Sequence, residues 1–279
     1  MDNRPIGVFD SGLGGLTVVR QLMRQLPGED IVYFGDTGRV PYGTRSPETI
    51  EKYTAQDCRF LISEDVKFII AACGTVSSVA PHILSALPVP ATGVVEPAAL
   101  AAVEATRNRR IGVIGTSATI SSGSFRRQIM QLRPNTTVFE QACPLFVPLV
   151  ENGWIGRDDQ VTRLTAHRYL IPLKEQGVDT LLLGCTHFPL LSPIIGEILG
   201  EEVTLIDSGQ ATAAACAAQL EQAGLLSMAG RTGRRRFYVS DRPDDFTRVA
   251  DMFLGCDVHE EIQTVNIEQV DQTGIVSAI

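Results

Sequence analysis

The chain has 279 residues, of which 44% are hydrophobic and 20% charged, a balance that excludes a disordered chain and allows two domains of ordinary size. Its 24 basic and 32 acidic residues give a formal charge of −8, which argues against nucleic acid as a main partner because phosphate binding needs a basic surface. The sequence has no apolar run of membrane-spanning length and no signal-peptide pattern at its start, so we expect a cytoplasmic protein without membrane contact.

Short apolar runs alternate with helical stretches along the first part of the chain. We predict strands at 6–9, 30–34 and 68–72, with helices at 16–26 and 50–63 between them. Near-continuous apolar strands separated by helices are typical of a parallel sheet covered on both faces.

The same pattern starts again in the second part of the chain. Residues 111–114 resemble 6–9, and residues 180–186 resemble 68–75, so that Cys185 repeats Cys73 at nearly the same offset. Two landmarks that recur in the same order predict two similar parallel-sheet α/β domains. The alternative is that any two α/β domains share apolar strands of this kind.

The last part of the chain is too short for a third domain. It contains predicted strands at 203–207 and 236–240 and predicted helices at 209–222 and 246–254. We therefore expect the tail to pack back on the first half. The predicted first α/β domain is discontinuous and consists of 1–96 plus 208–279, and the second consists of 97–207.

The residues that follow the predicted strands carry the candidate chemistry, because ligands of open parallel sheets bind beyond the carboxyl ends of the strands. They include thiols, hydroxyls, carboxylates and one imidazole, and they include no Lys or Arg. The set is Asp10, Ser11, Asp36, Thr37, Cys73, Gly74, Thr75, Gly115, Thr116, Cys185, Thr186 and His187. Amides and hydroxyls of this kind hold small anions without a net positive charge.

Two of the six cysteines, Cys73 and Cys185, lie at predicted turns from strand to helix, where a helix N-terminus favours a thiolate. If the two halves face each other, one thiol removes a proton from a carbon centre and the other returns one on the opposite face. The alternative is that both are small buried hydrophobic side chains. None of the cysteines forms a CxxC pair, so no metal site is expected.

Asp10 and His187 are candidates to assist one thiol each by accepting or relaying its proton. The alternatives are a helix cap for Asp10, where Ser11 would serve as well, and a structural role for His187. The glycine-rich segment 12–15 reads GxGG and lacks the third glycine of a dinucleotide loop. The one sharp basic run, at 234–236, is interpreted as a solvated strand edge, with an anionic partner as the alternative.

At these residues the sequence resembles the glutamate racemases of the cofactor-independent aspartate/glutamate racemase superfamily. The matching segments are 7–17 (GVFDSGLGGLT), 33–37 (YFGDT), 39–43 (RVPYG), 93–98 (GVVEPA), 144–151 (PLFVPLVE) and 183–191 (LGCTHFPLL). They occur in the family's order and run from the first predicted strand to about Gly209.

The resemblance implies two α/β domains related by pseudo-twofold symmetry, with the active site between them. It implies that Cys73 and Cys185 are catalytic, that Asp10 and His187 support them, and that Glu151 is a further candidate near Cys185. The substrate site would be lined by Asp10, Ser11, Tyr42, Gly43, Gly74, Thr75, Thr186 and His187. The substrate would be glutamate, inverted without pyridoxal phosphate, flavin or metal, and the product would be D-glutamate for bacterial peptidoglycan. Members of the family often form homodimers, but no contact face can be read from this sequence.

One position departs from the family's pattern. The family usually reads Cys-Asn-Thr-Ala around its first cysteine, whereas this chain reads Cys-Gly-Thr-Val at 73–76. The missing amide side chain would cost about 0.5–1.5 kcal/mol if it bonded a neutral substrate group. The departure keeps two alternatives open: a racemase or isomerase of another acidic substrate such as aspartate, and a non-catalytic paralogue that binds a metabolite or a protein partner.

Overall fold

The computed structural model describes residues 1–228, 230–241, 243–256 and 262–270, and its strands form two separate parallel sheets. The larger sheet has the order β10-β9-β2-β1-β3-β4. Its strands are β1 (Ile6–Asp10), β2 (Ile31–Gly35), β3 (Phe68–Ala71), β4 (Ala91–Gly93), β9 (Arg235–Val239) and β10 (Ile262–Thr264). The smaller sheet has the order β6-β5-β7-β8, from β5 (Arg110–Gly115), β6 (Thr137–Ala142), β7 (Thr180–Leu183) and β8 (Thr204–Asp207). The predicted fold class, two parallel-sheet α/β units, is confirmed.

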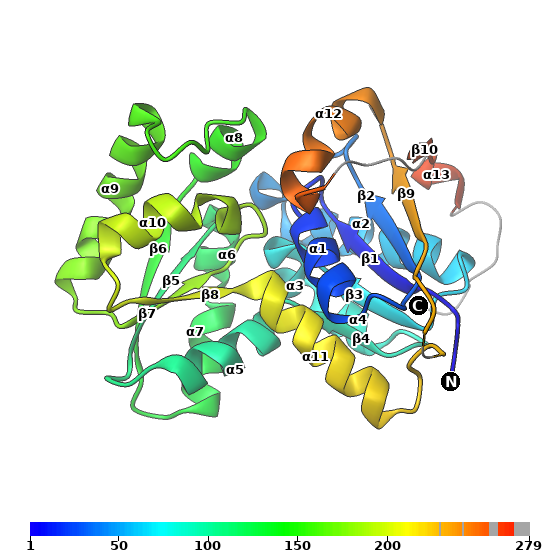
Figure 1. The fold of residues 1–279 in the computed structure, drawn as a ribbon, viewed down its shortest axis with the longest axis horizontal. Coiled ribbons are helices and arrows are strands. Elements are labelled where there is room, and N and C mark those ends of the chain that lie inside the picture. The colour runs from blue at the N-terminus through cyan, green and yellow to red at the C-terminus, as the bar shows by residue number, and fades with distance from the viewer. Residues whose placement is uncertain (229, 242, 257–261, 271–279) are drawn as a thin grey trace.

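The two sheets lie side by side, each with helices around it (Figure 1). The helices are α1 (Leu16–Gln25), α2 (Pro47–Ser63), α3 (Gly74–Val79), α4 (Pro81–Ser85), α5 (Val95–Ala105), α6 (Ser117–Ser122), α7 (Ser124–Leu132), α8 (Phe146–Glu151), α9 (Gln160–Glu175), α10 (Ser192–Leu199), α11 (Ser208–Gln222), α12 (Pro243–Leu254) and α13 (Ile267–Val270), with the 3₁₀ helices η1 (Tyr42–Thr44) and η2 (Phe188–Leu191). The predicted strands and helices named above are all present, with ends that differ by at most three residues. Helix α2 starts earlier than predicted because Ser46 caps it and Pro47 suits its first turn.

Buried apolar side chains cover both faces of each sheet. One core cluster packs the β1–β3 strands against α2, and another packs the β5–β7 strands against α5 and α7. The third and largest cluster runs continuously from α1 and α12, on the first sheet, to α8, α9 and α10 on the second. This shared core holds the two sheets in a defined relation, so that the carboxyl ends of their strands face one region of space.

Pairing of β9 with β2 attaches the tail of the chain to the larger sheet. The shared register runs from Ile31 opposite Arg235 to Gly35 opposite Val239. Residues 257–261 and 271–279, which belong to the predicted first domain, lie outside the described residues.

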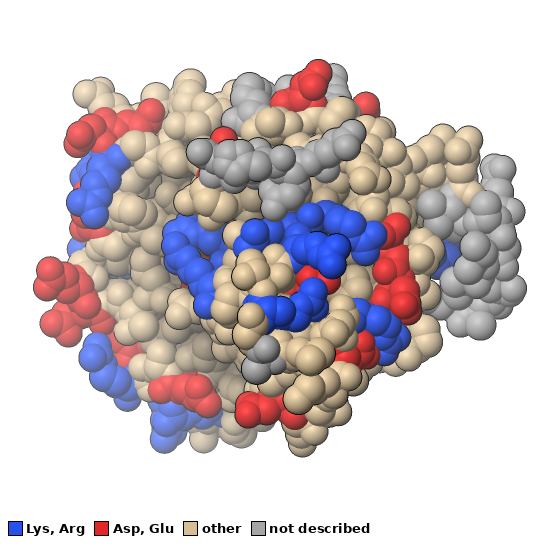
Figure 2. Space-filling view, turned by 45° about the vertical axis from the view of Figure 1, so that its right-hand side comes forward, with Lys and Arg blue, Asp and Glu red and all other residues tan. Residues whose placement is uncertain are grey.

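The basic run at 234–236 lies at the start of β9, and basic side chains gather in the middle of the face that Figure 2 shows, beside acidic ones. The Arg234 N–H donates to Asp30, and Arg236 forms an ion pair with Glu64. The side chains of Arg234 and Arg236 are exposed, so the run is solvated, but β9 pairs with β2 on one side and β10 on the other and is not an edge strand.

Candidate active site between the two sheets

A cavity of about 380 Å³ lies between the carboxyl ends of the two sets of strands. The residues that the racemase resemblance assigns to catalysis or substrate binding all line it. They are Asp10, Ser11, Tyr42, Gly43, Cys73, Gly74, Thr75, Glu151, Cys185, Thr186 and His187. Because these residues come from segments far apart in the sequence, the fold itself brings them together.

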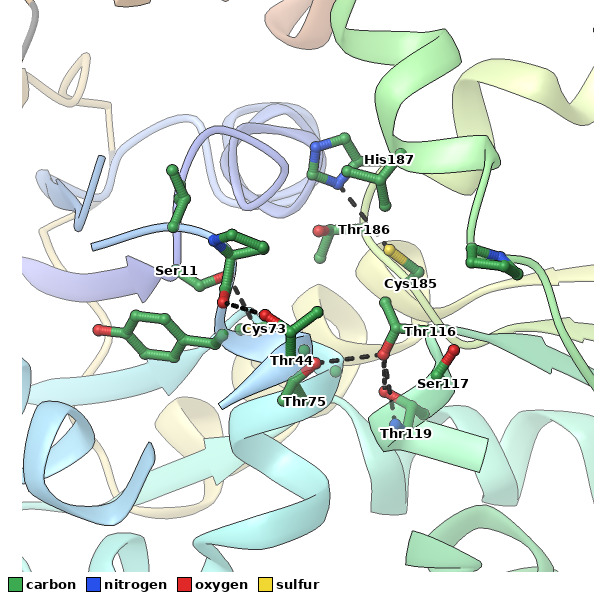
Figure 3. A pocket seen from close by; sticks show the side chains of 18 of the residues that line it. Ser11, Thr44, Cys73, Thr75, Thr116, Ser117, Thr119, Cys185, Thr186 and His187 are labelled. Carbon is green, nitrogen blue, oxygen red and sulfur yellow. Dashed lines mark hydrogen bonds between the residues drawn. The ribbon is translucent and has the colours of Figure 1, made fainter. Parts of the chain in front are cut away.

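One wall of the cavity belongs to the larger sheet. Asp10 is the last residue of β1, and Cys73 follows β3 as the N-cap of α3. The Ser11 Oγ atom lies 3.3 Å from the Cys73 Sγ atom, within hydrogen-bonding distance for sulfur. Both Cys73 and Asp10 are buried, so this thiol is reached from the cavity side (Figure 3).

Asp10 also organises the loop that follows β1. Its Oδ2 atom accepts hydrogen bonds from the Gly12 N–H at 3.2 Å and the Gly15 N–H at 3.1 Å, and Gly15 is the N-cap of α1. Burial raises the pKa of Asp10, against the lowering effect of His187 and the backbone N–H groups. The Asp10 carboxyl group therefore accepts hydrogen bonds at the start of α1 and also lines the cavity.

The opposite wall belongs to the smaller sheet and carries a chain of three polar groups. Cys185 follows β7, and its Sγ atom lies 3.8 Å from His187 Nδ1. His187 Nε2 in turn lies 3.0 Å from Glu151 Oε1, at the end of α8. The helix that follows Cys185 is the 3₁₀ helix η2, which precedes α10, so the predicted turn from strand to α-helix is present only at Cys73.

His187 is poised to carry a positive charge. Burial lowers its pKa, but the hydrogen bonds and negative charges of Cys185 and Glu151 outweigh burial and raise the pKa to about 10. At neutral pH the imidazole is therefore protonated, and it donates from both ring nitrogens, to Cys185 on one side and Glu151 on the other.

The expectation that a helix N-terminus makes Cys73 a thiolate is wrong. Burial raises the pKa of Cys73 to about 12, and the neighbouring Asp10 charge adds to the rise. The six-residue α3 is too short to offset this loss of solvation. Cys73 is therefore a neutral thiol at physiological pH.

Three close contacts join the two walls beside the cavity. The Thr75 and Thr116 hydroxyl oxygens lie 3.3 Å apart, and Figure 3 marks this hydrogen bond with a dashed line. A Cβ atom added to Gly74 would lie 2.4 Å from the Gly184 carbonyl oxygen, and one added to Gly14 would lie 2.2 Å from Thr186 Oγ1. Gly74 therefore lines the cavity through its backbone, and an asparagine in its place would require the walls to move apart.

Asp36, a candidate from the strand-end rule, does not line the cavity. It is fully buried behind Tyr42 and forms an ion pair with Arg39, at 2.6 Å. The Tyr42 hydroxyl group bonds to Asp36 and Asp57, so Tyr42 contributes its ring side and backbone to the wall rather than a free hydroxyl group.

Several lining residues were not singled out as site residues from the sequence. They are Gly12, Val40, Pro41, Thr44, Thr116, Ser117, Thr119, Cys143, Pro144, Val147, Pro148 and Gly184. Thr116 was flagged as following a strand, and the same rule applied to β6 would have found Cys143, a buried thiol after Ala142. The 144–148 segment lies in a stretch that resembles the racemases but carries no chemical group to mark it.

The described residues contain no group of three or more His, Cys, Asp or Glu side chains arranged to hold a metal ion. No Lys or Arg is among the residues that line the cavity. Within the described part of the chain, no helix combines the length and apolar character needed to cross a bilayer.

Comparison with known proteins places this architecture in a family. The family model described as Asp/Glu/Hydantoin racemase matches residues 6–216. A glutamate racemase from Geobacter metallireducens is 49% identical over 253 residues, which are 90% of this chain and 93% of the relative. One from Neisseria meningitidis is 48% identical over 95% of this chain and 97% of the relative. The crystal structure of glutamate racemase from Francisella tularensis, in complex with D-glutamate, superposes with a TM-score of 0.89 at 39% identity, over 96% of this chain and all of that one.

The fold and these similarities define an amino-acid racemase, an isomerase that inverts a carbon centre. In particular, the chain belongs to the Asp/Glu/hydantoin racemase family.

Proposed function

We propose that the protein is a glutamate racemase that interconverts L- and D-glutamate by proton transfer between its two cavity thiols, without a cofactor. The observation that carries the proposal is the placement of Cys73 and Cys185 on opposite walls of one cavity, each beside a polar partner. The relatives named as glutamate racemases, and the neighbour bound to D-glutamate, favour glutamate as the substrate.

In the proposed reaction, one sulfur removes the Cα proton as a thiolate while the other donates its S–H proton to the opposite face. With Cys185 as the base, the Cα–H electron pair stays on carbon as a carbanion, and Cys73 then protonates that carbon. The thiol and thiolate have exchanged places, so the reverse reaction starts from Cys73. His187, which Glu151 holds in place, pairs with the Cys185 thiolate. Ser11 and Asp10 assist proton transfer at Cys73.

Substrate recognition follows from the absence of Lys and Arg among the lining residues. We propose that the two substrate carboxylates are held by hydroxyl groups and backbone N–H groups, as expected for small anions. The donors are the side chains of Ser11, Thr75 and Thr186 and the backbone of Gly43 and Gly74.

The wider setting of the enzyme is part of the same proposal. Residues 1–96 with 208–279 form the first domain and 97–207 the second, a division in keeping with the two sheets. The enzyme supplies D-glutamate for peptidoglycan in the cytoplasm of a bacterium and acts as a homodimer.

The test uses purified protein without added cofactor in D₂O with L-glutamate. Loss of optical rotation together with deuterium incorporation at Cα is the expected result, because the returned proton comes from a thiol that exchanges with solvent. No change in either signal, with equal silence for D-glutamate, would refute the proposal. Activity on aspartate alone would instead assign the enzyme to the second acidic substrate, which the Gly74 departure keeps open.

A further inference from the structure

A buried polar cluster lies behind the part of the wall formed by residues 40–44. It consists of Asp36, Arg39, Tyr42 and Asp57, and is called the Asp57 cluster below. Asp36 and Asp57 are both fully buried. Arg39 joins them, with Nε 2.6 Å from Asp36 Oδ2 and Nη2 3.0 Å from Asp57 Oδ1. The cluster fastens the loop after β2 to helix α2.

The same cluster holds the Tyr42 hydroxyl group between two carboxyl groups. The hydroxyl oxygen bonds Asp36 Oδ2 and lies 3.0 Å from Asp57 Oδ2. One hydroxyl hydrogen cannot be donated to both carboxyl groups, and one guanidinium charge balances only one of the two as a carboxylate. One carboxyl group must therefore carry a proton.

The proton belongs on Asp57. Burial, with the nearby Asp36 charge next in importance, raises the pKa of Asp57 well above its ordinary value. A neutral Asp57 donates to the Tyr42 oxygen, Tyr42 donates to the Asp36 carboxylate, and Arg39 donates to Asp36 and to the remaining oxygen of Asp57. In this arrangement each hydrogen of Asp57 and Tyr42 has one acceptor, and both Asp57 oxygens and Asp36 Oδ2 are hydrogen-bonded.

The loop that the cluster holds forms part of the cavity wall. Residues 40–44 all line the cavity, and within the described structure the 3₁₀ helix η1 has no side-chain cap. The Arg39 guanidinium carbon lies 4.0 Å from the centre of the Tyr53 ring, which keeps the arginine against α2. Contacts made behind this wall, by the Asp57 cluster and by the Tyr53 ring, therefore contribute to its order.

We propose that Asp57 is a positioning residue that, as a neutral hydrogen-bond donor to Tyr42 within its cluster with Asp36 and Arg39, holds residues 40–44 in the geometry that binds substrate. The inference rests on the proposed racemase function for its kinetic consequence only. Asp57 itself does not line the cavity and takes no part in proton transfer.

The test compares Asp57→Asn with Asp57→Leu. An asparagine keeps both functions of a neutral acid, because its N–H donates to Tyr42 and its carbonyl oxygen accepts from Arg39. We expect its KM for glutamate to stay within about twofold of the wild-type value, since all four contacts survive. Leucine has the same shape and no polar atoms, and we expect it to raise KM about 10- to 100-fold with a smaller change in kcat, since displaced binding groups carry penalties of that order.

The matched control is Glu51→Leu, the same type of substitution on the outer side of helix α2, where the Glu51 side chain is 40% exposed. It should leave KM unchanged. If Asp57→Asn is as impaired as Asp57→Leu, the neutral-donor assignment is wrong, and if both retain wild-type KM, the positioning role is wrong.

A second measurement does not depend on catalysis. Hydrogen–deuterium exchange of the amides at 39–45 in the substrate-free protein should accelerate in Asp57→Leu and not in Asp57→Asn. If Asp57→Leu does not fold, Tyr42→Phe provides the comparison, since it removes only the hydroxyl group. Unchanged exchange in the folded variant that lacks the contact would overturn the inference. A wild-type protein that does not racemise glutamate would refute the proposed function while leaving this exchange result valid.

Discussion

The two cavity thiols have different neighbours. Cys73 lies beside a hydroxyl group and a buried carboxyl group, whereas Cys185 lies beside an imidazole held by Glu151. The two thiols therefore occupy corresponding positions, after β3 and after β7, but the groups available to exchange protons with them differ. Burial keeps the Cys73 thiol protonated, whereas Cys185 has a cationic partner in His187.

Alkylation of Cys73 should be slow at neutral pH. With a pKa of about 12 its thiolate fraction at pH 7 is on the order of 10⁻⁵, and the fraction rises about tenfold per pH unit up to that pKa. Peptide mass spectrometry after iodoacetamide treatment at pH 7 to 10 measures this, with the exposed Cys256 as an internal reference. A Cys73 rate that matches Cys256 at pH 7 would contradict the assignment.

Replacement of either thiol should stop inversion and spare binding. We expect Cys73→Ala and Cys185→Ala to lower kcat by about 10²–10⁴-fold or more, since each removes a group that transfers a proton. Calorimetric titration with glutamate should still detect binding in both variants. Racemisation at the wild-type rate by either variant would rule out the two-thiol mechanism.

His187 should contribute to stability in a pH-dependent way. Its folded-state pKa of about 10 lies above the ordinary value of 6.5, so its protonation favours the folded state. The contribution is fully present below pH 6.5 and is lost as pH rises towards 10. The difference in free energy of unfolding between wild type and His187→Gln should therefore shrink over this range, as urea denaturation can measure. A difference that does not change with pH would show that His187 is neutral in the folded protein.

At the level of strands, helices and loops, an element could be predicted from the sequence where a single physical rule determines its residue pattern. Apolar runs gave the strands 6–9 and 68–72, because parallel strands are buried on both faces. The strand-end rule found Cys73 and Cys185, since the carboxyl edge of a parallel sheet is an open concave region. The same rule brought in Asp36, which in the structure lies behind the wall, because local sequence does not specify which way a loop turns.

Other properties of the site depend on the packing of distant segments. The direction of the Cys73 pKa shift follows from its burial between the sheets, which no local pattern encodes. The contact of Gly74 with the Gly184 carbonyl oxygen likewise depends on how closely two loops approach after folding. Which residues line the cavity can therefore be predicted from the sequence more readily than their charge states and clearances.

Replacement of Gly14 by alanine, which adds only a methyl group, should destabilise the contact between the Gly14 loop and the Cys185 loop. An added Cβ would lie 2.2 Å from Thr186 Oγ1 and 2.4 Å from His187 Nδ1, so Gly14→Ala must displace the Cys185 loop. We expect a loss of about 1–3 kcal/mol in stability, as for other overpacked positions, and a clear fall in kcat. Gly156→Ala is the control, since a Cβ there meets nothing within 4 Å. If Gly14→Ala and Gly156→Ala have the same stability and kcat, the loops at Gly14 and Thr186 can separate without an energetic penalty.

At the scale of the whole molecule, a buried ion pair ties the N-terminal segment and the connection between α11 and β9 to the larger sheet. The Lys67 Nζ atom lies 2.6 Å from Glu29 Oε2, and it donates to the carbonyl oxygens of Asp2 and Leu225. These contacts connect the start of β3 to the N-terminal segment and to the connection between α11 and β9. The tail is therefore attached to the larger sheet at two places. One is Leu225, which precedes β9 in the sequence, and the other is the pairing of β9 with β2.

Removal of the lysine should destabilise the protein strongly. Lys67→Met leaves the Glu29 carboxylate buried without its cation, which typically costs about 3–5 kcal/mol. The double variant Lys67→Met/Glu29→Gln should recover part of the loss, because no buried charge remains. Thermal unfolding of the three proteins tests this, and a single variant no less stable than the double one would contradict it.

The unlike surroundings of the two thiols have a thermodynamic consequence for the proposed reaction. Enantiomers have equal free energies in water, so the equilibrium constant is one, and the ratio kcat/KM must be equal in the two directions at every pH. The difference between the Ser11 side and the His187 side can therefore appear only in kcat and KM taken separately, and both must change by the same factor. One direction will saturate at lower substrate concentration and turn over more slowly, so an asymmetric active site works as a catalyst with no preferred direction.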